Sequence, residues 1–322
     1  MDRRTPGYVR PVLTHPPDLP LPGHGATADR LRGLIGLGRA DLVACRLSEG
    51  HADAVAIRAE LGDADPENHA SGERWGVWAA SPSSVRAEHT PDGWTLTGDR
   101  PWCSGAGWCT DALVTAAADD GIRLFAVRNT LPHAQPLDGT WPAIGMAGSD
   151  SRTIRFTAAP ARPIGAPGAY VDRPGFWHGG IGVAACWFGG ALGVADALLD
   201  AARRKDLGPH ALAHLGAVDV ALGAARAVLD DAAARIDADP KADAHRLALR
   251  VRATAEATAT EVIDRVGRAL GAGPLCRDAD HAQRVADLTV YLRQSHAETD
   301  LEQLGRLLTT EDSAELARGP RW

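Results

Sequence analysis

Three long stretches in the second half of the chain constrain its fold most. They are rich in Ala, Leu and Arg and repeat apolar residues at helical spacing, over Phe176–Lys205, Pro209–Ile236 and Lys241–Leu270. Only short breaks with Gly or Pro separate them, so consecutive helices reverse direction and pack side by side. Shorter helical patterns follow at Ala279–Gln294 and Thr299–Leu308. This part of the chain is predicted to form an antiparallel helical bundle.

One stretch inside the first of these helices, Gly179–Ala195, has no charged residue. A membrane-spanning helix needs about 20 apolar residues, and here His178 precedes the run and Asp196 closes it. We therefore predict a buried core helix and no membrane span. Its Gly and Ala residues should let neighbouring helices approach closely.

The residues from 75 to about 165 have a different pattern. Strand-like segments occur at Trp75–Ala80, Trp94–Thr97, Ala112–Ala116, Arg123–Val127 and Thr153–Thr157, with Asp-Gly turn signals between several of them. Before them, helical patterns run from Thr27, a candidate N-cap, to Leu61. We predict an all-β insert between helical regions, with domains at 1–74, 75–172 and 173–322.

Composition excludes several classes of function. The 322 residues carry a formal net charge of −7, which argues against a nucleic-acid partner. The five cysteines form no C-x-x-C pair, and their odd number fits a reducing cytoplasm. The 12 histidines are dispersed, so no metal site is predicted. No glycine-rich phosphate loop follows a strand, and the N-terminus lacks the apolar segment of a secretory signal.

The stretch Gly93–Ala106, GWTLTGDRPWCSGA, carries the most specific chemistry. Its alternating residues predict a half-buried strand that Gly98 ends. Beyond this point Trp102 offers a flat aromatic face, Ser104 a hydroxyl, and the backbone free N–H groups. Such a set suits a planar, electron-accepting ring. Without further context the same residues describe a hairpin strand with a buried Trp.

The same stretch resembles the middle β-domain of the acyl-CoA dehydrogenase family, in which a strand ends in G-x-R/K-x-W-x-S/T-G-A. Trp141–Ser151 matches a second family segment, W-x-x-x-G-M-x-x-S/T-x-S. The resemblance implies that Trp102 packs on the flavin of FAD and that Ser104 hydrogen-bonds near its reactive nitrogen. The implied fold is α+β, with a short N-terminal α region, a middle β-barrel-like domain and a C-terminal antiparallel four-helix bundle.

Two further segments resemble the family. Gly38–His51 matches a helix of its N-terminal domain, G-R-x-D-L-x-x-x-R-L-x-E-G-H, although a surface amphipathic helix fits these residues equally well. GVWAASPSSV resembles the loop that wraps the flavin. There Ala80 takes the place of a flavin-contacting Thr, Ser81 that of a Glu, and Ser84 that of a late Ser. With about 74 residues ahead of the β-domain, we expect the family's first helices, which help close the acyl pocket, to be missing.

The resemblance also implies contacts to the cofactor of a neighbouring subunit. Arg204 begins a segment similar to R-x-x-F-G, whose Arg reaches the FAD pyrophosphate, and a guanidinium suits this because it offers forked donors. The alternative is a cationic last turn of a helix. Gly271 and Gly273 resemble a G-G-x-G turn that approaches the partner's cofactor, and a glycine C-cap explains Gly271 by itself.

The catalytic base departs from the family pattern. An E-G-T segment with a catalytic Glu should follow Asp287, but the sequence there contains Ser295 and His296, with Glu298 nearby. Three interpretations follow. His296 or Glu298 serves as the base; or the protein resembles the flavin-dependent monooxygenases of the same fold, which lack the Glu; or it is a non-catalytic partner subunit. Ser295 and Glu298 also have the spacing of a helix capping box.

The resemblance implies an FAD-dependent oxidoreductase that oxidises the CH–CH bond of an acyl thioester by hydride transfer to flavin. Its expected partners are an acyl-CoA or other acyl thioester substrate, an electron-accepting flavoprotein or oxygen, and further copies of the same chain in a dimer or tetramer. No membrane partner is expected, and the cytoplasm is the expected location.

Overall fold

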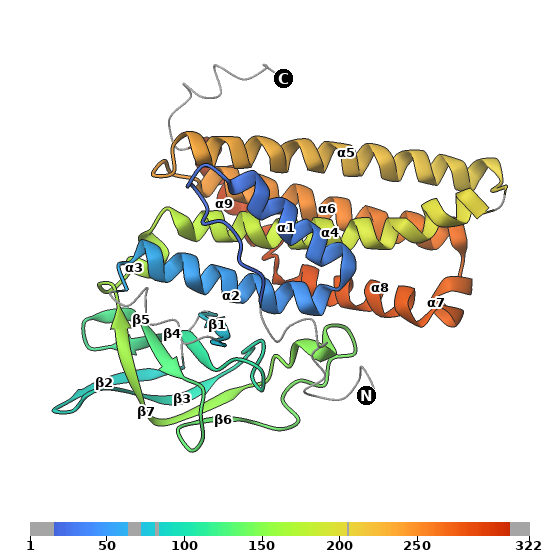
Figure 1. The fold of residues 1–322 in the computed structure, drawn as a ribbon. Coiled ribbons are helices and arrows are strands. Elements are labelled where there is room, and N and C mark those ends of the chain that lie inside the picture. Colours follow the sequence, from blue (N-terminus) through green and yellow to red (C-terminus); the bar gives the residue numbers. More distant parts are fainter. Residues whose placement is uncertain (1–15, 64–71, 81–83, 205, 310–322) are drawn as a thin grey trace.

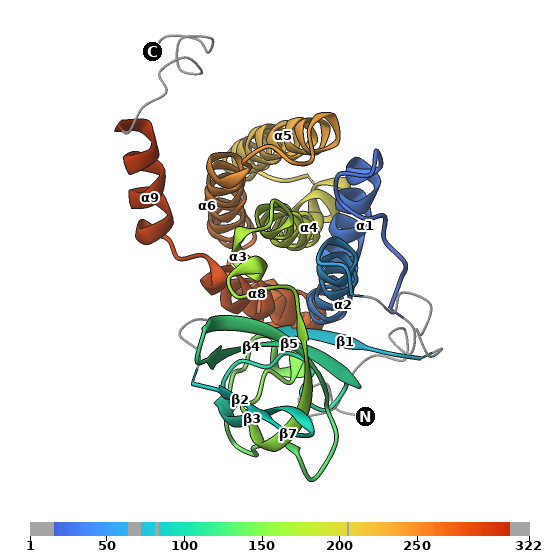
Figure 2. The ribbon, with the colours of Figure 1, turned by 90° about the vertical axis from the view of Figure 1, so that its left-hand side faces the viewer.

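The computed structural model describes residues 16–63, 72–80, 84–204 and 206–309. These residues form a layer of helices packed on a barrel of strands (Figure 1). Two helices, α1 (Thr27–Ala40) and α2 (Leu42–Glu60), precede the strands, and a short α3 (Ala169–Asp172) leads out of them. Viewed end-on, α2 and α8 (Ala279–Tyr291) lie between the barrel and the other helices (Figure 2).

The middle region closes into a barrel. Its strands are β1 (Trp75–Trp78), β2 (Arg86–Thr90), β3 (Gly93–Arg100), β4 (Asp111–Ala118), β5 (Gly121–Arg128), β6 (Ala134–Pro136) and β7 (Ile154–Ile164). Hydrogen bonds link β4, β2, β3, β7 and β5 in that order, and β5 pairs back with β4 along its whole length. Phe125, Phe156 and Leu96 fill the interior. The predicted α+β fold with a barrel-like middle domain is confirmed.

The sequence pattern missed two strands and misjudged one glycine. In β2 only Ala87 is buried, and β6 has three residues, so neither shows apolar alternation. The prediction that Gly98 ends its strand was wrong. β3 continues to Arg100, and the register shifts between Leu96 and Gly98, where Gly98 has a φ of +129°. A lone glycine in a strand often marks such a bulge.

Four long or medium helices follow the barrel. They are α4 (Gly175–Arg204), α5 (Pro209–Ala238), α6 (His245–Leu270) and α8, with the short α7 (Gly273–Arg277) before α8 and α9 (Glu298–Thr309) at the end. α4 lies at the centre of the bundle, surrounded by the other helices (Figure 2). Trp187 and Phe188 of α4 are fully buried in the main apolar cluster.

The sequence predicted that Thr27 caps its helix, and this prediction was wrong. Thr27 is the first residue of α1, and no side chain of the same segment caps that end. Instead, Asp237 at the end of α5 accepts hydrogen bonds from the Thr27 backbone N–H (3.0 Å) and hydroxyl (2.6 Å) and from Gly25 N–H (3.1 Å). The cap is therefore supplied across the bundle, and a local pattern could not reveal it.

Glycines let α1 and α4 cross at close range, as predicted for the uncharged stretch. A Cβ at Gly38 would lie 2.6 Å from the carbonyl oxygen of Cys186, and a Cβ at Gly189 would collide with the carbonyl oxygen of Ile35. The backbones of the two helices meet directly at this crossing.

In the part of the chain that the structure describes, two helices, α4 and α5, are long and apolar enough by composition alone to cross a membrane. In α4, 78% of the apolar window is buried, in agreement with the predicted core helix. In α5 the buried share is 17%, so much of its apolar surface faces outward.

Replacing Gly189 with Ala should destabilise the fold, because the methyl group has no room at the α1–α4 crossing. We expect a loss of about 2 kcal/mol in the free energy of unfolding, measured by urea denaturation. Gly223→Ala is the matched control, since a Cβ there meets no described atom within 4 Å. It should stabilise α5 by about 0.5–1 kcal/mol. Equal effects of the two changes would contradict the close crossing.

Candidate functional site

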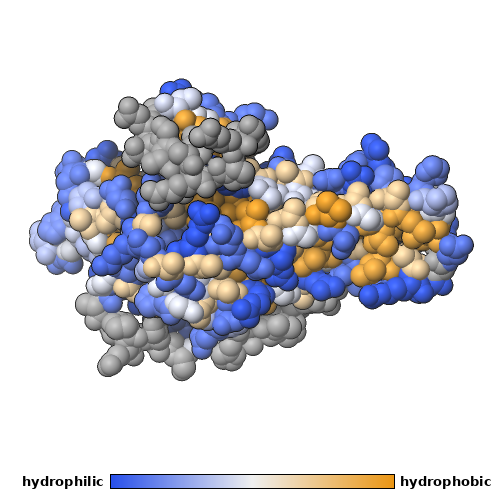
Figure 3. Space-filling view, turned by 90° about the horizontal axis from the view of Figure 1, so that it is seen from above, coloured by the Kyte–Doolittle hydropathy of each residue, from blue (hydrophilic) through white to orange (hydrophobic). Residues whose placement is uncertain are grey.

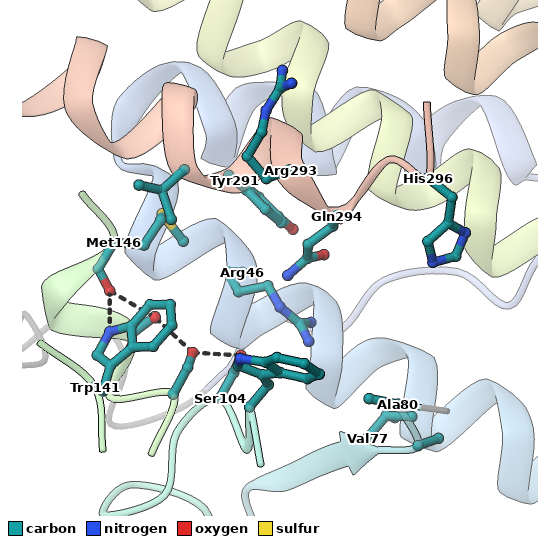
Figure 4. A pocket seen from close by; sticks show the side chains of 15 residues that line it. Arg46, Val77, Ala80, Ser104, Trp141, Met146, Tyr291, Arg293, Gln294 and His296 are labelled. Carbon is teal, nitrogen blue, oxygen red and sulfur yellow. Dashed lines mark hydrogen bonds between the residues drawn. The ribbon is translucent and has the colours of Figure 1, made fainter. Parts of the chain in front are cut away.

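A cavity of about 660 Å³ lies where the barrel meets α2 and the end of α8 (Figure 4). This volume is in the range of pockets that hold small molecules and cofactors. Four of the residues singled out from the sequence line it: Ala80, Trp102, Ser104 and His296. Their convergence from three distant parts of the chain makes this cavity the candidate site.

Trp102 stands in the cavity wall in an unusual conformation. Its φ is +58°, in the left-handed region that costs a non-glycine residue about 1 kcal/mol or more. Its side chain is 63% exposed, so the alternative of a buried hairpin Trp was wrong. A large aromatic that is both strained and exposed indicates a contact the protein alone does not satisfy.

The predicted free backbone N–H groups around Ser104 are not free. The N–H groups of Cys103, Gly105 and Ala106 donate to the carbonyl oxygens of Arg152, Ser149 and Asp150, at 2.7–3.1 Å. These bonds lock the segment after Trp102 onto the segment before β7. The polar groups presented to the cavity here are therefore side-chain hydroxyls.

Those hydroxyls form a chain with a fixed direction. The Ser149 hydroxyl donates to the carbonyl oxygen of Met146 (2.7 Å), the Ser151 hydroxyl lies 2.8 Å from Ser149 Oγ, and Ser104 Oγ lies 2.9 Å from Ser151 Oγ. Each hydroxyl has one proton. Because Ser149 uses its proton on the carbonyl, Ser151 must donate to Ser149 and Ser104 to Ser151. Ser104 therefore presents a lone pair to the cavity, which suits a ring N–H donor.

Asp287 joins the barrel-side wall of the cavity to α8. Its Oδ1 accepts hydrogen bonds from Met146 N–H (2.5 Å) and Gln283 Nε2 (2.8 Å). A Cβ at Gly145 would collide with the backbone of Ala286, so only glycine allows this close approach. The Trp141–Ser151 motif is thus held against the bundle by a carboxylate and a glycine.

Arg100 holds the opposite rim. Its side chain is fully buried, and its guanidinium donates to the carbonyl oxygen of Ala80 (2.5 Å) and to Thr115 Oγ1 (2.9 Å). Ala80 lines the cavity, but Ser84 does not: its hydroxyl donates to the carbonyl oxygen of Asp99. Ser81, the third residue predicted in this loop, lies outside the described residues.

His296 is placed at the cavity and Glu298 is not. The Nδ1 of His296 lies 3.2 Å from Oδ1 of Asp300, a buried carboxylate that also accepts from the His296 backbone N–H (3.3 Å). Glu298 is exposed as the first residue of α9. Ser295 Oγ accepts from Ala297 N–H (3.2 Å), so the capping hydrogen bond differs from that of a capping box.

Sequence reasoning missed two polar residues of the cavity, the half-buried Arg46 and the buried Tyr291. Arg46 reaches it from α2 and pairs with Glu49 at 2.5 Å, and Tyr291 reaches it from the end of α8 (Figure 4). Arg46 belongs to the helix motif already recognised, so its fixed place there was an available signal. Nothing local distinguishes Tyr291 from a core tyrosine.

Arg204, Gly271 and Gly273 lie away from this cavity. Arg204 is the exposed last residue of α4, while Gly271, with a φ of +66°, and Gly273 follow the end of α6. Since α5 reverses direction between them, α4 and α6 end on the same side of the bundle (Figure 1). None of the three residues lines the cavity of their own chain.

No family model and no curated protein matches this sequence. Solved structures do match. Dibenzothiophene monooxygenase TdsC from Paenibacillus sp. A11-2 is 21% identical, with 86% of this chain and 82% of that chain covered and a TM-score of 0.72. KijD3 in complex with FMN and a dTDP-sugar is 19% identical, with 89% of this chain and 81% of that chain covered and a TM-score of 0.75. Butyryl-CoA dehydrogenase from Megasphaera elsdenii is 16% identical, with 88% of this chain and 82% of that chain covered and a TM-score of 0.77.

The chain therefore has the acyl-CoA dehydrogenase fold, and the resemblance predicted from the sequence is confirmed at that level. Structures of this fold include a dehydrogenase, a monooxygenase and a hydroxylase. The residues of the cavity fit a flavin ring, with an exposed aromatic face at Trp102 and an oriented hydroxyl at Ser104.

Mutation can test separately the expected contact of the Trp102 ring with a flavin and the strain of the Trp102 backbone. Trp102→Gly and Trp102→Ala both remove the ring, so both should lower flavin affinity at least tenfold in a fluorescence titration. Only glycine relieves the left-handed backbone, so Trp102→Gly should be more stable than Trp102→Ala by about 1 kcal/mol. Equal stability of the two variants would contradict the strain, and wild-type flavin affinity would contradict the contact.

Proposed function

We propose that this protein is a flavin-dependent oxidoreductase whose flavin ring binds against Trp102 and Ser104. The observation that carries the proposal is the convergence of these two residues, Ala80 and His296 on one cavity in a fold shared with flavin enzymes. A bound flavin supplies two-electron redox chemistry. The directed hydroxyl chain leaves Ser104 with a lone pair for the N–H that a flavin ring carries when reduced.

The cavity favours oxygen-dependent chemistry, as in a monooxygenase. Among the described residues that line it, none is Asp or Glu, so the carboxylate base of an acyl-CoA dehydrogenase has no counterpart there. In a monooxygenase reaction one atom of O₂ enters the substrate and the other leaves as water, with two electrons from reduced flavin. In this reaction His296, which Asp300 orients, would take up and release the protons that the reacting groups exchange.

Oxidation of an acyl thioester is the second candidate. The His296–Asp300 pair supports it, because an imidazole held by a carboxylate can act as the general base that takes an α-proton. Glu298, the other base considered, has no part in this proposal because it does not line the cavity. The same fold occurs in butyryl-CoA dehydrogenase.

A second copy of this chain completes the proposed assembly. Leu212 and Val220 on α5 are 48% and 72% exposed, and apolar residues gather along the side of the molecule that α5 presents (Figure 3). An apolar helix face of this kind favours burial in an interface. An oligomer would also give Arg204, Gly271 and Gly273 a cofactor to contact, that of a neighbouring subunit.

The nature of the flavin can be tested at Arg204. If the cofactor is FAD, Arg204→Ala should weaken FAD binding about tenfold by removing a forked donor to the pyrophosphate, and FMN binding should not change. Arg203→Ala is the matched control. An FMN enzyme would bind FMN as tightly as FAD and show no effect of Arg204→Ala on either cofactor.

The reaction class can be tested with the flavin-loaded protein. Under anaerobic conditions a panel of acyl-CoA thioesters should leave the flavin absorbance band unchanged, whereas the dithionite-reduced protein should be re-oxidised when O₂ is added. Bleaching by one thioester would favour the dehydrogenase candidate. A protein that takes up neither FAD nor FMN would overturn the proposed function and favour a non-catalytic subunit.

A further inference from the structure

The inner end of the cavity contains a tyrosine hydroxyl without a hydrogen-bond partner. Tyr291 is 1% exposed, and its ring packs edge-on against Trp187. Its hydroxyl is buried and forms no hydrogen bond with the described residues. Buried tyrosine hydroxyls usually find a partner. Burial also raises the pKa of Tyr291, so the phenol keeps its proton and can donate it.

Arg46 faces the same space from α2. One of its nitrogens, Nη1, pairs with Glu49, while its buried Nε has no partner among the described residues. Burial opposes the charge, but the neighbouring acidic groups, Glu49 foremost, together outweigh this effect and hold the pKa of Arg46 above its ordinary value. A guanidinium has five N–H donors, so this permanently charged group has donors left for a ligand.

The surroundings of this pair are rich in donors and poor in acceptors. Figure 4 shows the side chains of Arg46, Tyr291 and Gln294 converging on one part of the cavity. No described lining residue is acidic, while Trp141, Met146 and Val290 supply apolar surface beside them. A ligand group that accepts two hydrogen bonds and carries negative charge would satisfy both the Tyr291 hydroxyl and the Arg46 guanidinium.

We propose that Arg46 and Tyr291 form a subsite for an anionic oxygen of the substrate, a carboxylate or a phenolate, whose apolar body lies against the aromatic wall of the cavity. The proposal rests on the proposed function in taking the cavity as a substrate site. It goes beyond it in assigning a substrate class, because neither residue belongs to the flavin contacts argued above. A neutral substrate would leave the tyrosine hydroxyl or the guanidinium unsatisfied.

The test is calorimetric titration of the protein, with and without bound flavin, using benzoate and 4-nitrophenolate and their neutral counterparts benzamide and nitrobenzene. The wild type should bind at least one anion about tenfold more tightly than its neutral counterpart. Preference for benzoate indicates a carboxylate substrate, and preference for 4-nitrophenolate indicates a phenolate. Equal binding of anions and neutral counterparts would overturn the proposal.

Two variants and a control assign the effect to the pair. Tyr291→Phe should weaken anion binding about tenfold without lowering the thermal stability of the free protein, because the lost hydroxyl has no partner there. Arg46→Met should weaken it further. Since Arg46→Met leaves Glu49 buried without its cation and can impair folding, Tyr291→Phe is the decisive variant. Tyr170→Phe, on α3 outside the cavity, should bind anions like the wild type.

The outcomes separate this proposal from the proposed function. If Tyr291→Phe weakens flavin binding and leaves anion binding unchanged, the pair serves the flavin, and the subsite is overturned. If the wild type binds no flavin yet binds anions through Tyr291, the subsite stands and the flavin function fails. If Tyr291→Phe binds both ligands like the wild type, the subsite is wrong whatever the flavin does.

Discussion

The hydrogen bond from Met146 N–H to the carboxylate of Asp287 connects the two layers of this protein at the point where its cavity lies. On one side it fixes the Trp141–Ser151 segment, and that segment in turn holds the Trp102–Gly105 segment through backbone hydrogen bonds. On the other side it fixes α8, which ends at Tyr291 and leads into the turn that carries Gln294. Together with the close approach of Gly145 to Ala286, this bond fixes the two walls of the cavity relative to each other.

The site contains strained and unsatisfied groups. Trp102 combines a left-handed backbone with an exposed ring, and Tyr291 keeps a buried hydroxyl that has no partner among the described residues. Each costs on the order of 1–3 kcal/mol in the free protein. Ligands that relieve these costs gain affinity from them, so the same features that weaken the fold locally favour binding. The tightly packed α1–α4 crossing lies outside the cavity and supplies stability elsewhere.

Much of the fold could be predicted from the sequence because it depends on local patterns. Apolar spacing in α4, α5 and α6 predicts helices of nearly their observed length, and turns of Asp and Gly mark the β4–β5 hairpin. The patterns failed where local signals are weak or ambiguous. β2 and β6 bury too few side chains to show alternation, and Gly98 marks a bulge, although a glycine can equally end a strand.

The sequence by itself determined the order of helices and strands, the resemblance to one fold, and the segments that carry Trp102, Ser104 and His296. Only the tertiary structure decided which of the candidate residues share a cavity. It separated Ser84 and Glu298 from that cavity and brought Arg46 and Tyr291 into it. The physical reason is that hydrogen-bond partners and burial are properties of contacts between distant segments. The free N–H groups expected near Ser104 were consumed by such a contact, and the Tyr291 hydroxyl was left without one.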